Sequence, residues 1–162
     1  MFGARAWCLI GAIGISFFGK PLQAGNKNAL LIGYGVYGIR GKTTLAGRLE
    51  YRLGRVAWLF HPMFGLQLST DGSRYAYGGL NYDIPLSSVF YVSLNVAAGA
   101  YDRDGGKDLG GVVEFKSGLG IGMMMSRSLL MSISFHHISN ASLYRNNPGI
   151  ETIQYNVIFL FH

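Results

Sequence analysis

The sequence has 162 residues, a formal net charge of +6, 49% hydrophobic residues and only 14% charged ones. This length indicates one domain, and the 24 Gly, 10 Tyr and 10 Phe residues argue against a soluble helical protein and for tight turns and aromatic-rich strands. The sequence contains no run of basic residues, which argues against nucleic acid as a partner.

Residues 1–24 have the organisation of a secretory signal peptide. Arg5 provides a positive start, an apolar segment follows over residues 7–18, and Lys20 ends that segment. Residues 21–24, ending in Ala24, are the expected cleavage region. The sequence therefore predicts an exported protein.

The remaining chain, residues 25–162, is expected to form a single domain. Cys8 is the only Cys and lies in the signal segment, so the mature chain has neither a disulfide nor thiol chemistry. Loss of residues 1–24 removes Arg5 and Lys20 but no acid, which lowers the net charge to +4. Beyond residue 24 no stretch of 18 residues is apolar throughout, so no transmembrane helix is expected.

Eight segments of about ten residues have strand character and are separated by turn residues. They are residues 29–40, 43–53, 57–69, 75–84, 89–101, 111–123, 128–139 and 149–161. Regular short strands without a helical pattern are typical of a β-sandwich or a β-barrel.

Within these segments apolar and polar residues alternate. In the last segment Ile153, Tyr155 and Val157 alternate with Gln154 and Asn156. A soluble sandwich or a soluble lipid-binding barrel could also show this alternation. Strand length, the even strand number and the signal peptide together favour an eight-stranded antiparallel transmembrane β-barrel of the bacterial outer membrane.

The breaks between segments predict an orientation. With both termini in the periplasm, the short breaks at 54–55, 85–88 and 126–127 are periplasmic, and the longer polar breaks at 70–74, 102–110 and 140–148 are extracellular. The first break, at residues 41–42, is shorter than this asymmetry predicts.

A His, a Ser and a Glu near the C-terminus have the spacing of a nucleophilic site. His137 and Ser139 are two residues apart, so on a strand they share one face and the imidazole can reach the hydroxyl. Residues 145–149 carry turn chemistry, and Glu151 returns on the next strand, where it can orient the base.

On a membrane barrel all three residues continue the lipid-facing rows of their strands, at the extracellular end. An alternative interpretation is that they are interfacial polar residues, because polar groups on the lipid face are well tolerated near the interface. His136 points to the opposite face from His137, so the two cannot bind one metal, and His136 is expected in the lumen.

Two motifs carry a family resemblance. His137-x-Ser139-Asn140-Ala141 and residues 147–151 (Asn-Pro-Gly-Ile-Glu) resemble the active-site region of the outer-membrane lipid A 3-O-deacylase family of the PagL type, whose members are also described as acyloxyacyl hydrolase-like proteins. Residues 108–118 resemble the family with less diagnostic value. Ser142 departs from the expected Gly.

The resemblance implies a serine esterase that hydrolyses an ester-linked (3-hydroxy)acyl chain of lipid A in lipopolysaccharide. Ser139 would be the nucleophile, His137 the general base and Glu151 its orienting acid, while Asn140 would help to hold the oxyanion. The scheme requires no metal and no cofactor.

The sequence also suggests where the acyl chain would bind, and it leaves the oligomeric state and two alternative functions open. Phe115 and Phe135 would line a groove for the chain. A homodimer is left open. The alternative functions are a non-enzymatic structural or adhesive outer-membrane barrel and a soluble lipid-binding barrel of the periplasm.

Overall fold

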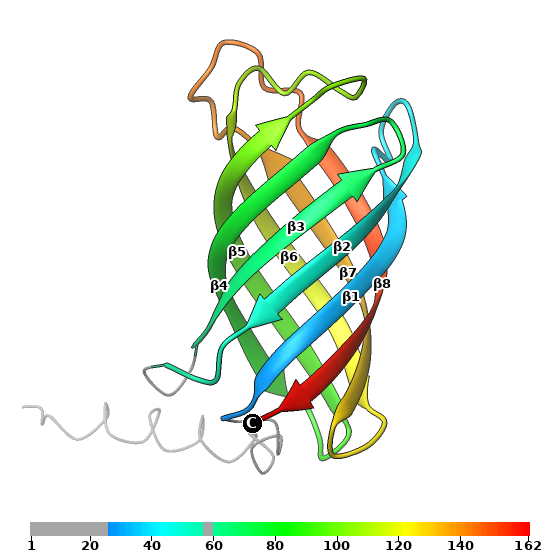
Figure 1. Ribbon diagram of the computed structural model, residues 1–162, viewed down its shortest axis with the longest axis vertical. Helices are drawn as coiled ribbons and strands as arrows, with labels where there is room; N and C mark the ends of the chain where they lie inside the picture. The colour runs from blue at the N-terminus through cyan, green and yellow to red at the C-terminus, as the bar shows by residue number, and fades with distance from the viewer. Residues whose placement is uncertain (1–25, 57–59) are drawn as a thin grey trace, which may run out of the picture.

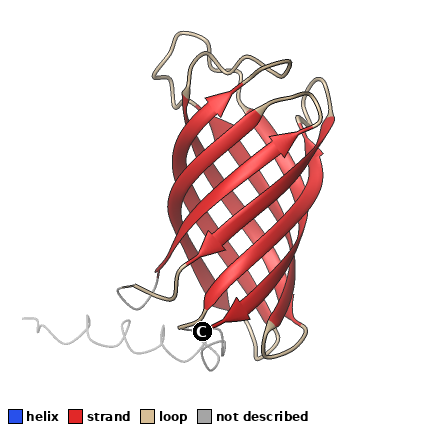
Figure 2. Ribbon diagram, in the orientation of Figure 1, coloured by secondary structure: helices blue, strands red, loops and turns tan. Residues whose placement is uncertain are grey.

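The chain forms eight β-strands in the computed structural model, which describes residues 26–56 and 60–162. The strands are β1 (Asn28–Tyr37), β2 (Thr44–Arg52), β3 (Phe60–Ser69), β4 (Arg74–Pro85), β5 (Phe90–Asp102), β6 (Val113–Met124), β7 (Leu129–Ser139) and β8 (Ile150–Phe161). Loops and turns connect them (Figure 2). The expected signal segment, residues 1–24, lies outside the described residues. Within the described ranges, no helix has the length and apolar character needed to cross a membrane.

The strands close into a barrel in which each strand pairs antiparallel with the next and β8 pairs with β1 (Figure 1). Closure leaves no strand edge unpaired, as lipid requires, because a bilayer core offers no water to free backbone groups. The expected eight-stranded antiparallel barrel is confirmed.

Two boundaries differ by three residues from the sequence-based expectation, and the others agree within two residues. The first strand ends at Tyr37 rather than residue 40, because Gly38 takes the positive φ of 77° that turns the chain out of the sheet. The first loop therefore spans residues 38–43 and is not exceptionally short. The connection between β2 and β3 spans residues 53–59, longer than the expected two-residue break, and residues 57–59 are not described.

Alternation along the strands places polar side chains inside and apolar ones outside. In β8, Gln154 and Asn156 are buried in the barrel, while Tyr155 is 67% exposed on its outer wall. Ile133 and Phe135 in β7 are likewise exposed, whereas Ser134 between them is buried, and so is His136, as expected. A soluble barrel would have the reverse arrangement, so the outer wall is built to face lipid.

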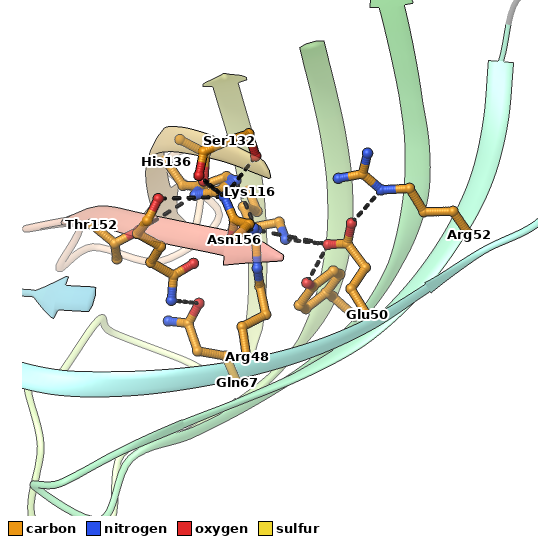
Figure 3. Close-up of polar contacts among 12 residues, drawn as sticks. Arg48, Glu50, Arg52, Gln67, Lys116, Ser132, His136, Thr152 and Asn156 are labelled. Carbon is orange, nitrogen blue, oxygen red and sulfur yellow. Dashed lines mark hydrogen bonds and ion pairs between the residues drawn. The ribbon is translucent and has the colours of Figure 1, made fainter. Parts of the chain in front are cut away.

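A buried charge cluster centred on Glu50 fills the middle of the lumen (Figure 3). Arg52 Nε donates to Glu50 Oε1 at 2.8 Å, and Tyr77 Oη donates to Glu50 Oε2 at 2.6 Å. Lys116 Nζ lies 3.5 Å and Arg48 Nη1 lies 3.7 Å from Glu50 Oε2. One carboxylate therefore faces three cations, and Lys116 also lies over the Tyr77 ring, 3.3 Å from its centroid.

The cluster extends to β7 and β8 through Arg48. Its guanidinium donates from Nη1 to His136 Nε2 at 2.9 Å and from Nη2 to Asn156 Oδ1 at 2.6 Å (Figure 3). The other ring nitrogen of His136 is 3.5 Å from Thr152 Oγ1. Side chains from β2, β4, β6, β7 and β8 thus meet across the barrel and hold opposite walls together.

Two apolar clusters lie on either side of this polar layer. One gathers near the long loops and includes Tyr37, Tyr75, Ile138 and Ile150. The other lies near the start of β1 and the end of β8 and includes Leu31, Tyr91, Leu130 and Ile158. Buried side chains therefore fill the lumen along its length.

The two rims of the barrel differ, and we call them the loop rim and the terminal rim. The loop rim carries the connections 38–43, 70–73, 103–112 and 140–149, and the terminal rim carries the start of β1, the end of β8 and the connections that follow β2, β4 and β6 (Figure 1). The 103–112 and 140–149 loops are the longest. The loop rim is the side expected to be extracellular.

The central role of Glu50 leads to a stability prediction. Replacing Glu50 by Gln leaves three buried cations without their counter-charge and should lower the free energy of unfolding by about 3–5 kcal/mol. The measurement is urea unfolding of the barrel in lipid vesicles, followed by circular dichroism. Asp104→Asn is the matched control, because its pair with Arg74 is exposed and should contribute less than about 1 kcal/mol. Equal midpoints for Glu50→Gln and wild type would contradict the prediction.

Candidate active site

His137, Ser139 and Glu151 lie together at the loop rim, on the outer wall of the barrel. His137 and Ser139 are near the end of β7, and Glu151 is the second residue of β8. His137 and Glu151 are direct cross-strand partners. The shared face follows from strand alternation, and the shared height follows from the register of β7 with β8.

The imidazole of His137 lies beside the carboxylate of Glu151. His137 Nδ1 lies 3.5 Å from Glu151 Oε1, and the side chains are 43% and 12% exposed. This contact leaves Nε2 of His137 free of the carboxylate. Ser139 is half-buried two residues further along the same face, about 6.5–7 Å along the strand. Among the described residues, Ser139 and His137 are not hydrogen-bonded to each other.

Backbone geometry around β8 holds this pair in place. Gly149 has a φ of 60°, and a Cβ there would lie 2.6 Å from His137 Cε1, so only Gly lets the imidazole pack against the chain. The carbonyl of Glu151 accepts a hydrogen bond from Gly38 N at 3.0 Å. Arg40 Nη1 lies 3.8 Å from Glu151 Oε1, so the loop after β1 covers the carboxylate.

Asn140 connects the two longest loops. Its fully buried side chain donates from Nδ2 to Leu109 O at 2.6 Å and to Asn146 O at 2.7 Å. Its backbone N–H donates to Asn147 Oδ1 at 3.1 Å. Both hydrogens of the Asn140 amide are therefore engaged with loop carbonyls, whereas Asn147 is exposed and its Nδ2 makes no hydrogen bond within the described residues.

The chain turns sharply just after Ser139. Leu143 N donates to Asn140 O at 2.9 Å, and the two residues between them, Ala141 and Ser142, have φ values of 50° and 66°. Two consecutive positive φ values define a type I′ turn, which favours Gly or Asn. Ser142, at the position where the family resemblance predicts Gly, therefore occupies a strained conformation.

An apolar groove runs along the outer wall below the site. A hollow of about 420 Å³ is lined by Leu119, Ile133, Phe135 and Ile153. It shares Ile133 with a second hollow of about 520 Å³ closer to the terminal rim. Phe135 thus lies in the groove, whereas Phe115 lies beside it as the cross-strand partner of Ser139 and is 39% exposed.

Sequence reasoning missed three contributors to this site. Arg40 was assigned to a strand, and Gly149 and Asn147 were interpreted as residues of the turn and of the family motif, without a contact of their own in the site. The positive φ of Gly149 could have been suspected from Pro148-Gly149, which is turn chemistry. The approach of Arg40 to Glu151 depends on the closure of β1 onto β8 and has no local signal.

Comparison with known proteins gives a family match. A family model described as lipid A 3-O-deacylase (PagL) matches residues 33–159. No curated protein sequence matches the chain.

Solved structures of outer-membrane and designed barrels share the fold. The crystal structure of the outer membrane enzyme PagL has a TM-score of 0.65 at 16% identity, covering 81% of this chain and 98% of that one. De novo designed transmembrane β-barrels give a TM-score of 0.64 at 8% identity, covering 84% and 96%. The Yersinia pestis outer membrane protein Ail in a nanodisc gives 0.54 at 12% identity, covering 84% and 99%.

The turn after Ser139 leads to a second stability prediction. Ser142→Gly should raise the free energy of unfolding by about 1 kcal/mol, because Gly adopts a positive φ without the steric cost that Ser meets. The measurement is the same urea titration in vesicles. Ser128→Gly, in a turn where the φ is not positive, should instead be neutral or destabilising. A loss of stability in Ser142→Gly would contradict the strain argument.

Proposed function

The chain belongs to the lipid A 3-O-deacylase (PagL) family, and we propose that this bacterial outer-membrane barrel removes an ester-linked (3-hydroxy)acyl chain from lipid A. In this proposal Ser139 is the nucleophile, His137 is the general base and Glu151 is the acid that orients His137. The family and the barrel fold support the substrate class and the location. The assignment of roles to the three residues is our proposal.

One observation carries the proposal, namely the contact between His137 and Glu151 on the lipid-facing wall. The side chain of Glu151 is 12% exposed and lies against an imidazole and a guanidinium, whereas a polar residue that merely marks the membrane boundary would extend into water. A nearly covered carboxylate beside a half-exposed His, with a Ser on the same face, is the combination that nucleophilic catalysis requires.

The proposed reaction begins with lipid A in the outer leaflet, beside the wall. His137 Nε2 takes the proton of Ser139 as Oγ attacks the ester carbonyl, and Glu151 fixes the tautomer and stabilises the imidazolium. The tetrahedral intermediate collapses to an acyl-enzyme, and the departing sugar hydroxyl takes the proton from His137. Water, deprotonated by His137, then releases the fatty acid and restores Ser139. The ester thus yields one alcohol and one acid.

Two Asn residues are candidates for holding the oxyanion. Asn140, the residue expected from the family resemblance, would first have to release Leu109 O or Asn146 O. Asn147 has its Oδ1 fixed by the Asn140 N–H, which leaves its amide hydrogens available for a developing negative charge. We therefore propose that Asn147 donates to the oxyanion and that Asn140 positions it.

The apolar groove fits the acyl chain of such a substrate. It begins at Phe135 and Ile153 next to the site and continues down the wall that faces the hydrocarbon layer. We propose that Phe135 contacts the chain in the groove and that Phe115 borders the ester beside Ser139. The homodimer left open by the sequence has no support in the comparisons.

The decisive test of the triad is Ser139→Ala. In outer membranes containing wild type, mass spectrometry should find lipid A that lacks one hydroxyacyl chain, and with Ser139→Ala the rate should fall by about 10⁴-fold or more. His137→Gln should cause a similar loss, and Glu151→Gln a smaller one. Ser128→Ala, an exposed serine at the terminal rim, is the matched control and should retain activity. Identical lipid A from wild type and Ser139→Ala, with both barrels folded, would favour a structural or adhesive barrel instead.

Substitutions of Asn140 and Asn147 should have different effects on the reaction rate and on the stability of the barrel. Asn147→Ala should lower kcat by about 10²–10³-fold with unchanged stability, as the loss of one oxyanion donor does. Asn140→Ala leaves the buried carbonyl groups of the loops without donors and should lower the free energy of unfolding by about 1–3 kcal/mol. The opposite pattern, with a kinetic defect only in Asn140→Ala, would assign the oxyanion contact to Asn140.

A further inference from the structure

We propose that a basic pocket at the loop rim, formed by Arg40, Lys42 and Lys107, binds a phosphate group of the lipid A headgroup and so sets which ester reaches Ser139. This inference rests on the proposed function, because it names the feature of the same substrate that would be recognised outside the reacting ester.

The pocket lies where three loops converge above the barrel. It has a volume of about 200 Å³ and is lined by residues of the 38–43 loop, by Asp71, by residues 105–107 and by Ile150 at the start of β8. Because a water molecule takes about 30 Å³, this space accommodates a phosphate with part of its sugar. The walls include Gly38, Gly41, Gly105 and Gly106, which expose backbone rather than side chains.

The charges around the pocket leave it positive. Asp71, its one acidic lining residue, already accepts hydrogen bonds from Ser73 N at 3.0 Å and Ser73 Oγ at 2.7 Å. Arg40 is 84% exposed, and its nearest carboxylate in the described structure is Glu151 at 3.8 Å. Lys42 is exposed and forms no ion pair with any described residue. A phosphate, with its charge of about −1.5 to −2, would neutralise the excess positive charge of the pocket.

Lys107 connects the pocket to the candidate active site. Its Nζ donates to Gly149 O at 2.7 Å and to Pro148 O at 3.5 Å, which leaves one ammonium hydrogen for a ligand. Gly149 packs against the His137 ring, and Glu151 is two residues further on. On the other side, Gly38 N donates to Glu151 O. The pocket and the triad are therefore built on the same backbone.

This shared backbone suits a substrate whose ester and phosphate belong to one headgroup. Lipid A carries its acyl esters and its phosphates on the same sugar unit, so a phosphate held by Arg40, Lys42 and Lys107 restricts the positions that the sugar can take. Arg and Lys recognise phosphate through charge-assisted hydrogen bonds. The groove would bind any long acyl chain, whereas the pocket distinguishes a phosphorylated headgroup from a neutral one.

The test compares two lipids with three proteins in mixed micelles. The lipids are bisphosphorylated lipid A and the same lipid A after removal of both phosphates, and the proteins are wild type, Lys42→Gln and Arg127→Gln. Arg127 is an exposed cation at the terminal rim, so its variant matches the change in net charge. Lys42→Gln should raise KM about tenfold for the phosphorylated lipid, leave kcat unchanged, and leave both constants unchanged for the dephosphorylated lipid. Arg127→Gln should match wild type with both.

A tenfold change corresponds to about 1.4 kcal/mol, within the range of one charge-assisted hydrogen bond. Equal KM values for the two lipids with wild type, or an equal shift for both lipids in Lys42→Gln, would overturn the proposal. Competition by inorganic phosphate, combined with equal KM values for the two lipids, would assign the pocket to free phosphate and would likewise overturn it.

Binding without turnover separates this proposal from the proposed function. Native mass spectrometry of Ser139→Ala should detect preferential binding of phosphorylated over dephosphorylated lipid A, and adding Lys42→Gln should reduce the preference about tenfold. If wild type hydrolyses neither lipid but this preference is present, the phosphate pocket stands and the esterase assignment fails. If wild type hydrolyses both lipids and no preference is found, the esterase stands and the pocket fails.

Discussion

The ion cluster around Glu50 is the interaction on which the rest of the barrel depends. An outer wall in contact with lipid can carry only apolar side chains, so alternation sends every second side chain into a lumen too narrow for bulk water. There, charges must satisfy one another. Glu50 does so with Arg48, Arg52 and Lys116, and Arg48 extends the network to His136 on β7. The cluster thereby joins β2, β6 and β7 across the lumen and holds the charged side chains of these strands inside the barrel.

The candidate active site lies where the outer wall no longer has to be apolar. Near the membrane boundary the outer wall tolerates polar groups, and it is there that His137, Ser139 and Glu151 replace the apolar residues that continue their rows further down. Apolar clusters fill the lumen above and below the polar layer, so the lumen has no room for a lipid substrate, which would have to bind at the outer wall. In the proposed function, a lipid reaches the wall by lateral diffusion, with its acyl chains along the apolar groove and its headgroup at the loop rim.

The loops do more than connect strands, because they hold the groups around the triad. The buried Asn140 ties the 103–112 and 140–149 loops together, and the strained turn at Ala141 and Ser142 follows immediately. Strain of this kind is maintained only where surrounding contacts over-determine the conformation, and here those contacts are hydrogen bonds from a fully buried amide. Such over-determined loop contacts suit the proposed roles of Ser139 as nucleophile, His137 as base and Asn147 as oxyanion donor on an open surface.

The sequence by itself determined the strand number, the alternation and the shared face of the trio, because a period of two residues is a local property. It also determined the family, through the motif around His137 and Ser139. Only the tertiary structure decided what depends on closure and on loop paths. The approach of Arg40 to Glu151 requires β1 to pair with β8, and the engagement of the Asn140 amide requires two loops separated by the two strands β6 and β7 to meet. The pocket of Arg40, Lys42 and Lys107 joins residues from both halves of the chain, and no spacing in the sequence predicts it.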